Sequence, residues 1–322
     1  METGIIYTPL FQNHENYPEC PERMKLAAQY LIKNGINMFT EPRLFDESWI
    51  QQVHTPEYIN HIITTGSVDY SNIHYEHALL SAFGCLTAGE MLLQDEVKNA
   101  FVLNRPPGHH TYADRGGGFC YLNNAAILTR YLQMHGMEKI MIVDWDAHHG
   151  NGTESIFYDD PSVLYTSIHQ SPLYPGTGEI QDTGVGKGEG YTINIPVPPG
   201  TGHNSYMKIF SEIILPVGKQ FHPDAVVVSA GQDSHKNDPL SSLCLCAGSY
   251  YTMTRQILTS ITPNVIGILE GGYNLTSLPI CIHAIVTALQ KKKFTGDIEK
   301  VNEPDGIMQN IKSVKSTHPN WW

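Results

Sequence analysis

Carboxylate and imidazole side chains stand at alternate positions in one stretch of the chain. The apolar run Ile140–Val143, typical of a buried parallel strand, is followed by Asp144, Asp146 and His148. Because alternate positions of an extended chain point the same way, we expect these side chains to face one point. Carboxylate oxygen and imidazole nitrogen suit Zn²⁺ or a similar divalent ion. The stretch predicts a metal site, and the alternative is a strand that ends in a polar loop without metal.

Three more predicted strands also end in polar residues. The strands and the polar residues that follow them are 100–103 with Arg105–His110, 224–231 with Asp233, and 265–270 with Tyr273. The carboxyl ends of parallel strands meet at one edge of an open α/β sheet, where ligands bind. Each of these residues alone is more often structural than catalytic. Four such strand ends at one edge favour a shared active site.

The predicted site has the residues needed for metal-assisted amide hydrolysis. Asp146, His148 and Asp233 would supply three metal ligands and leave a coordination position open, as in catalytic metal sites. A metal there lowers the pKa of a bound water and polarises a carbonyl group. A neighbouring histidine can take the proton of that water and later give it to a leaving amine. Tyr273 can donate a hydrogen bond to the developing oxyanion.

Predicted strands alternate with predicted helices along the chain, which favours an α/β fold with a parallel sheet. Further strands are expected at 4–8, 163–169 and 191–197. Helices are expected at 21–33, 47–65, 77–93, 123–135, 207–219, 249–258 and 278–291. No change in composition and no internal repeat separates two units. We therefore expect a single catalytic domain over residues 1–322, with a mainly parallel sheet flanked by helices and the active site at the carboxyl ends of its strands.

Composition narrows the classes of partner. The 322 residues are 41% hydrophobic and 16% charged, and the net charge is −12. An acidic chain without a basic run is a poor candidate for binding nucleic acid. No apolar run reaches the roughly 18–20 residues that span a bilayer, and no signal peptide pattern begins the sequence. We expect a cytoplasmic protein that binds neither nucleic acid nor membrane.

The six cysteines form no Cys-x-x-Cys pair. Free thiols in a reducing compartment are the favoured interpretation, and a disulfide framework is the alternative.

Short motifs stand in order along almost the whole sequence. They are Pro18–Arg23, Arg105–His110, Gly118–Asn123, Asp144–Gly152, Pro175–Gly178, Ser229–Asp233, Asp238–Leu240 and Leu269–Asn274. Together they resemble the zinc-dependent histone deacetylases and acetylpolyamine amidohydrolases. The resemblance implies the arginase–deacetylase type of fold, one zinc ion per chain and hydrolysis of acyl-lysine amides in proteins or peptides. It leaves the oligomeric state open.

The resemblance also implies a role for each site residue. Asp146, His148 and Asp233 would bind zinc, His110 would be the general base and acid, and Tyr273 would polarise the acetyl carbonyl. His109 would give electrostatic support, Asp144 would orient His109, and Asn151 would contact His110. The acyl-lysine side chain would enter a narrow tunnel formed by Gly118, Phe119, Tyr174 and Leu240.

Members of this family also bind potassium, so the resemblance implies two cation sites. The inner site would comprise Asp144, Asp146, His148, Ser167 and Ile168, and the outer site Phe157, Asp160, Val163 and Tyr191. Arg23 matches an arginine that lines an internal cavity beneath the metal.

Two positions place the chain within the family, and a third departs from its pattern. Asn151 stands where class I enzymes carry an aspartate and class II enzymes an asparagine, so the chain is class II-like. A neutral partner leaves His110 less basic than a carboxylate does. Leu240 stands where polyamine-specific relatives carry a gatekeeper glutamate, which favours acyl-lysine as substrate. Gln232 replaces the aromatic residue more usual before the metal-binding aspartate.

Three alternatives remain. An acetylpolyamine or other small-molecule deacetylase would use the same mechanism. A binuclear manganese ureohydrolase would need a second set of carboxylates, and His149–Asn151 and Gly231–Gln232 do not supply it. A weakly catalytic module that binds acyl-lysine is disfavoured by Tyr273.

Overall fold

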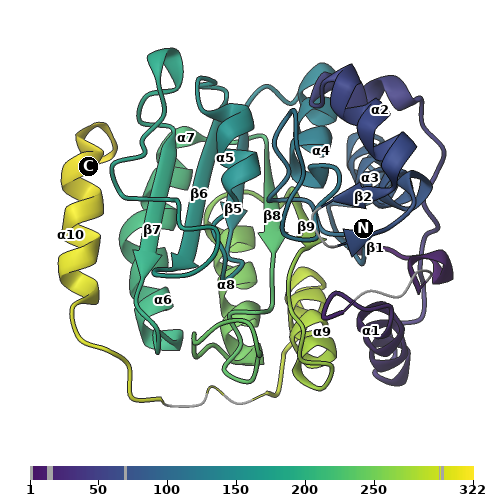
Figure 1. The fold of residues 1–322 in the computed structure, drawn as a ribbon. Coiled ribbons are helices and arrows are strands. Elements are labelled where there is room, and N and C mark those ends of the chain that lie inside the picture. The colour runs from purple at the N-terminus through teal and green to yellow at the C-terminus, as the bar shows by residue number, and fades with distance from the viewer. Residues whose placement is uncertain (1–2, 13–16, 69–70, 297, 299–300) are drawn as a thin grey trace.

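A parallel sheet of seven strands forms the centre of the protein. The computed structural model describes residues 3–12, 17–68, 71–296, 298 and 301–322. The strands, in their order across the sheet, are β1 (Thr3–Ile6), β4 (Asn99–Val102), β9 (Val265–Leu269), β8 (Ala225–Ala230), β5 (Ile140–Asp144), β6 (Val163–Gln170) and β7 (Thr192–Val197) (Figure 1). Every neighbouring pair is parallel. This architecture confirms the predicted fold class.

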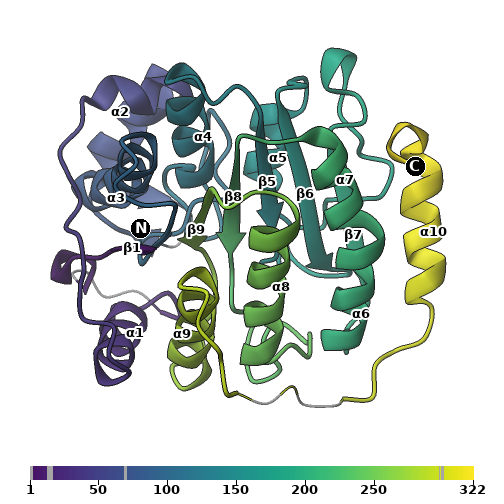
Figure 2. The same ribbon diagram turned by 180° about the vertical axis from the view of Figure 1, so that it is seen from behind.

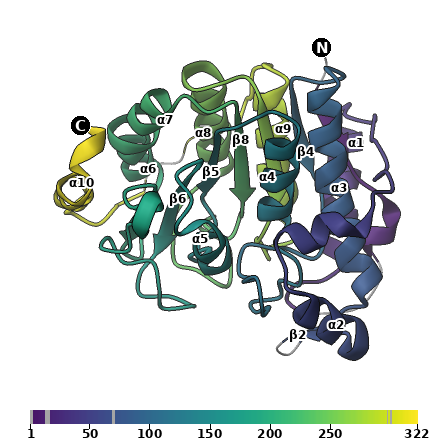
Figure 3. The same cartoon turned by 90° about the horizontal axis from the view of Figure 1, so that it is seen from above.

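Helices cover both faces of the sheet, and the views from behind and from above show the two layers (Figures 2 and 3). One layer contains α2 (Pro56–Thr65), α3 (Tyr75–Leu93), α4 (Asn124–Met134) and α5 (Asn151–Phe157). The other contains α1 (Glu22–Lys33), α6 (His203–Ile209), α7 (Leu215–Phe221), α8 (Ala247–Ser260) and α9 (Ser277–Leu289). A short hairpin, β2 (Ser67–Val68) with β3 (Ser71–Asn72), lies near α2.

Successive residues of each central strand alternate between these two layers. In β5, Met141 and Val143 pack in one hydrophobic cluster, while Ile140 and Ile142 pack in the other. All five residues of β5 are buried. Burial on both faces explains why the strand appears in the sequence as an uninterrupted apolar run.

The expected helix over 47–65 forms as two separate elements. A 3₁₀ helix covers Glu47–Gln52, and α2 begins at Pro56. Thr55 caps α2 because its hydroxyl accepts a hydrogen bond from the backbone N–H of Tyr58 at 3.3 Å. Proline fits the first helical position, where its missing N–H is not needed.

A helix that the sequence analysis did not predict protects one edge of the sheet. α10 (Ile307–Thr317) lies along β7 (Figure 1). Ring nitrogens beyond the helix donate to edge carbonyls: His318 Nε2 to Thr192 at 2.8 Å, and Trp321 Nε1 to Gly190 at 2.7 Å. These contacts satisfy polar groups that an open edge exposes. Among the described helices, none combines the length and the apolar character needed to cross a membrane.

Candidate active site

The three predicted metal ligands converge at the carboxyl ends of two neighbouring strands. Asp146 and His148 follow β5, and Asp233 follows β8, which pairs with β5. Nδ1 of His148 lies 3.1 Å from Oδ1 of Asp146 and 3.0 Å from Oδ2 of Asp233. All three residues are buried, and one ligand atom of each lies within 4.8 Å of the others. One nitrogen and two carboxylate oxygens around one point fit a divalent ion such as zinc.

This convergence depends on a turn rather than on an extended strand. β5 ends at Asp144, so the expectation of an extended segment through His148 is wrong. The backbone N–H of Asp146 donates to Oδ1 of Asp144 at 3.1 Å, and that of His148 donates to Oδ1 of Asp146 at 2.9 Å. Asp side chains compete in this way with regular backbone pairing.

Backbone donors hold the two carboxylates in place. The N–H of Ala147 donates to Oδ1 of Asp233, and the N–H of Gly271 donates to Oδ2 of Asp146, both at 2.8 Å. A Cβ atom at Gly271 would collide with the Asp233 carboxylate. Glycine is therefore required where this backbone approaches the site.

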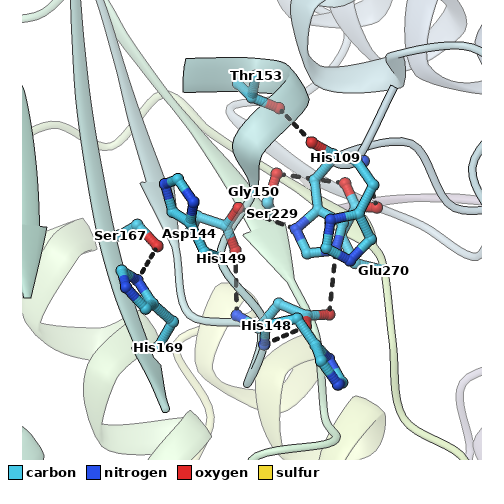
Figure 4. Close-up of polar contacts among 12 residues, drawn as sticks. His109, Asp144, His148, His149, Gly150, Thr153, Ser167, His169, Ser229 and Glu270 are labelled. Carbon is cyan, nitrogen blue, oxygen red and sulfur yellow. Dashed lines mark hydrogen bonds and ion pairs between the residues drawn. The ribbon is translucent and has the colours of Figure 1, made fainter. Parts of the chain in front are cut away.

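Two adjacent histidines face the metal ligands, and each has an oxygen partner. Nδ1 of His109 lies 3.1 Å from Oδ2 of Asp144, a contact visible in Figure 4. Nδ1 of His110 lies 2.8 Å from Oδ1 of Asn151. Because an oxygen must accept, each Nδ1 carries the proton, which leaves Nε2 of a neutral His110 free to accept another. The structure thus brings these four predicted residues together, and their roles remain predictions.

The environments of the two imidazoles shift their pKa values in opposite directions. Burial lowers the pKa of His110 well below its ordinary value, and the rings of His109 and His148 lower it further. Burial also opposes protonation of His109, but the Asp146 and Asp144 carboxylates outweigh it and raise its pKa well above the ordinary value. These opposite shifts suit a pair in which His110 is neutral and can accept a proton, while His109 is already protonated.

Glu270 holds the histidine loop against the sheet, and the sequence analysis gave it no role. Its Oε2 accepts hydrogen bonds from the backbone N–H groups of Gly108 at 2.7 Å and His109 at 3.2 Å. Its Oε1 accepts from the hydroxyl of Ser229 at 3.2 Å (Figure 4). Burial raises the pKa of Glu270 to about 7. A glutamate at the end of the apolar strand 265–270 was the only signal of this role.

A buried ionic cluster supports the loop that carries Tyr273. Nε of Arg23 donates to the carbonyl of Gly272 at 2.7 Å, and its guanidinium lies 5.1 Å from the centre of the Tyr273 ring. Glu19 pairs with Arg23 at 2.8 Å and with Arg105 at 2.9 Å. Burial raises the pKa of Tyr273 well above its ordinary value, which keeps its hydroxyl protonated.

We expect Glu19→Gln to lower the free energy of unfolding by about 3–5 kcal/mol, the cost of breaking a buried ion pair. The substitution removes the carboxylate that pairs with the buried guanidinium groups of Arg23 and Arg105. Urea denaturation measures the change. Glu57→Gln, at an exposed position in the first turn of α2, is the matched control and should lower stability by no more than about 1 kcal/mol, the contribution of a charge at a helix N-terminus. Equal stability of the two variants would contradict this account of the cluster.

A pocket of about 370 Å³ opens above these residues. Its walls contain all four predicted substrate-binding residues, and Leu173 as a fifth that the sequence analysis missed; the lining is His110, Gly118, Phe119, His148, Leu173, Tyr174, Leu240 and Tyr273. Gly118 has φ +56°, and a Cβ atom there would collide with the His110 ring. The backbone can therefore approach the histidine only at a glycine.

The residues of the predicted potassium sites lie on neighbouring elements. At the inner site, Asp144 of β5 is in register with Ser167 of β6, and the Ser167 hydroxyl lies 2.8 Å from Nδ1 of His169 (Figure 4). At the outer site, the Asp160 carboxylate pairs with Arg130 at 2.6 Å. A cation there would therefore depend mainly on other oxygen atoms. These contacts test neither site, and both remain predictions.

The chain belongs to the histone deacetylase family, because the model of the histone deacetylase domain matches residues 17–289. It is 39% identical to a probable deacetylase of Archaeoglobus fulgidus, across 100% of this chain and 99% of that protein. It is 34% identical to histone deacetylase 15 of Arabidopsis thaliana, across 100% of this chain and 61% of that protein. The family and its class II-like character were therefore predicted correctly.

A solved structure agrees with the same assignment. The crystal structure of the HDA15 HD domain superposes with a TM-score of 0.93 at 31% identity, covering 100% of this chain and 97% of that one. The chain spans only 38% of histone deacetylase 6 of Caenorhabditis elegans. What the longer relatives do as whole proteins therefore carries over only as a proposal.

Proposed function

We propose that this chain is a zinc-dependent amidohydrolase that removes acyl groups from the side-chain amine of lysine in proteins or peptides. The observation that carries the proposal is the pocket itself. Its lining combines the apolar side chains of Phe119, Tyr174 and Leu240 with the polar groups of His110, His148 and Tyr273. The two histidines are buried, whereas Tyr174 is half exposed. A long apolar side chain that ends in an amide fits such a pocket.

The chain's own residues have separate tasks in this reaction. Asp146, His148 and Asp233 would hold the zinc ion, which when bound polarises the acyl carbonyl and lowers the pKa of a water molecule. Nε2 of His110 takes a proton from the attacking water and later gives it to the departing lysine amine. The Tyr273 hydroxyl donates a hydrogen bond to the acyl oxygen as negative charge develops there.

A deacetylase of acetylated polyamines is the second candidate. The net charge of −12 favours cationic substrates in general, and the archaeal relative is described only as a probable deacetylase. The substrates of the two candidates differ, because a polyamine carries further ammonium groups and a lysine side chain does not. Leu240 offers no charge to such groups.

Initial rates on an acetyl-lysine peptide and on an N-acetylated polyamine, measured side by side on the zinc-loaded enzyme, separate the two candidates. We expect turnover of the peptide with little turnover of the polyamine. Leu240→Glu should shift this preference toward the polyamine by about 1 kcal/mol or more, at least roughly fivefold, because it adds a charge to the pocket lining. Leu240→Met, close in volume and neutral, is the control. A wild-type enzyme that prefers the polyamine would contradict the lysine assignment.

We also propose, from the family resemblance, that potassium binds at the inner site of Asp144, Asp146, His148, Ser167 and Ile168. In support, Asp144 ends β5, and β5 pairs with β6, which carries Ser167 and Ile168. From the interpretation of the six cysteines as free thiols in a reducing compartment, we propose that the protein acts in the cytoplasm. Dependence of the rate on potassium, with sodium as the replacement ion, tests the first statement.

A further inference from the structure

The Asn151 amide contacts two residues, one at each end. Its Oδ1 lies 2.8 Å from Nδ1 of His110, and its Nδ2 donates to the hydroxyl of Tyr112 at 2.9 Å. Tyr112 is not among the residues that line the pocket. Its hydroxyl is therefore linked to the proposed general base through Asn151.

The backbone around Tyr112 is fixed by the segment that precedes α2. Nδ1 of His54 donates to the Tyr112 carbonyl at 3.0 Å, and Nε2 of His54 accepts from the backbone N–H of Asn123 at 2.9 Å. The N–H of Thr55 donates to the carbonyl of Ala113 at 2.9 Å. Burial lowers the pKa of His54 to about 4, so the imidazole remains neutral and keeps both contacts at neutral pH.

The ring of Tyr112 is held as well. The guanidinium carbon of Arg115 lies 3.6 Å from the ring centre, which is close enough for a cation–π interaction. The backbone N–H of Tyr112 donates to the Arg115 carbonyl at 2.8 Å and closes the turn. The direction of the Tyr112 hydroxyl is therefore set by its surroundings and not by Asn151 alone.

An asparagine partner needs such support more than an aspartate does. The two ends of an amide have nearly the same shape but opposite hydrogen-bonding character. If the amide turns by half a rotation, N–H₂ faces Nδ1 of His110, and the His110 proton moves to Nε2. An imidazole in that form cannot accept a proton on the side of the pocket.

We propose that Tyr112 is a positioning residue for the deacetylation reaction: its hydroxyl holds the Asn151 side chain where Oδ1 reaches Nδ1 of His110, and without that contact the amide is freer to turn. The inference rests on the proposed function, in which His110 accepts the proton of the attacking water. Tyr112 touches neither substrate nor metal in this account and acts only through Asn151.

Tyr112→Phe removes the hydroxyl and keeps the ring beneath Arg115. We expect kcat on the acetyl-lysine peptide to fall roughly three- to tenfold, the loss of one hydrogen bond, with KM constant within about twofold. The control is Tyr251→Phe, which removes a hydroxyl that donates to the Lys292 carbonyl outside the pocket lining. An unchanged kcat, or an equal loss in the control, would overturn the proposal.

Combining Tyr112→Phe with Asn151→Asp tests whether Tyr112 acts through the orientation of the Asn151 amide or through general packing around the site. Both oxygens of a carboxylate can accept from His110, so its orientation matters less. In the Asn151→Asp background the loss caused by Tyr112→Phe should shrink to less than about twofold. An equal loss in both backgrounds would show that Tyr112 acts by another route and would contradict the proposal.

The ¹⁵N chemical shifts of His110 in the metal-free chain provide a readout that does not depend on turnover. The signal is assigned by its loss in His110→Gln. We expect the Nδ1–H form in the wild type and a measurable share of the Nε2–H form in Tyr112→Phe. Identical tautomer populations in the two proteins would contradict the proposal. If the wild type hydrolyses no acyl-lysine substrate but the populations still shift, the proposed function fails while the positioning role stands.

Discussion

Asp233→Ala is expected to abolish zinc binding and deacetylation together. The substitution removes one of three ligands and leaves only Asp146 and His148 around the metal position. We expect kcat/KM to fall by more than about 100-fold, since removal of outer-shell partners of a metal already costs 10–100-fold. Zinc content after dialysis and initial rates on an acetyl-lysine peptide measure the two effects.

Asp305→Ala is the matched control, because it removes an exposed carboxylate that does not line the pocket. It should keep both zinc and activity. If Asp233→Ala retains one zinc per chain and a wild-type rate, Asp233 is not a ligand of the catalytic metal.

Tyr273→Phe is expected to keep the metal and to lose most of the activity. The hydroxyl is protonated, because burial raises its pKa, and it lies in the lining of the pocket with His110 and His148. Removal of one oxyanion donor costs about 2.7–4 kcal/mol of transition-state stabilisation, or roughly 10²–10³-fold in kcat. Rates at saturating peptide and the zinc content of the same sample measure the effect.

Tyr30→Phe, on α1 and outside the pocket lining, should behave as the wild type. Turnover by Tyr273→Phe within about twofold of the wild type would remove the oxyanion role, because the expected loss is far larger. Loss of zinc in this variant would instead assign Tyr273 to metal binding, which the account excludes. These results and those for Asp233 distinguish a ligand from a donor to the substrate.

The strand ends could be predicted from the sequence because each buried strand is an apolar run with polar residues after it. Ile140–Val143 and the residues that follow it are an example. The order of the motifs then predicted which side chains share the sheet edge. Only the strand direction matters for this expectation, and all neighbouring strands of the seven-stranded sheet are parallel.

Contacts between backbone groups and carboxylates could not be predicted in the same way. The turn from Asp144 to His148 depends on two side-chain acceptors, and Glu270 holds the histidine loop through two N–H groups. Neither leaves a periodic pattern. The turn depends on two aspartates that each accept from a backbone N–H two residues further on, and the Glu270 contacts join segments more than 160 residues apart in the sequence. The hydrogen bond between Asn151 and Tyr112 likewise leaves no periodic pattern, because it joins residues 39 positions apart in the sequence.

Two of the differences between the predicted and observed helices have a related cause. α10 is short and buries only Ile311 and Val314, so its apolar face is narrow. The break between Gln52 and Pro56 depends on a capping hydroxyl and a proline at the first helical position. Helical periodicity alone runs through that break.

The most direct test of the central claim is stoichiometric reconstitution with zinc. The wild-type chain is stripped with a chelator, zinc is added in steps, and the initial rate on an acetyl-lysine peptide is followed. The account predicts a negligible rate for the stripped protein and a rate that rises linearly to a plateau at one zinc per chain. Full activity without metal, or a plateau that requires two zinc ions, would contradict it.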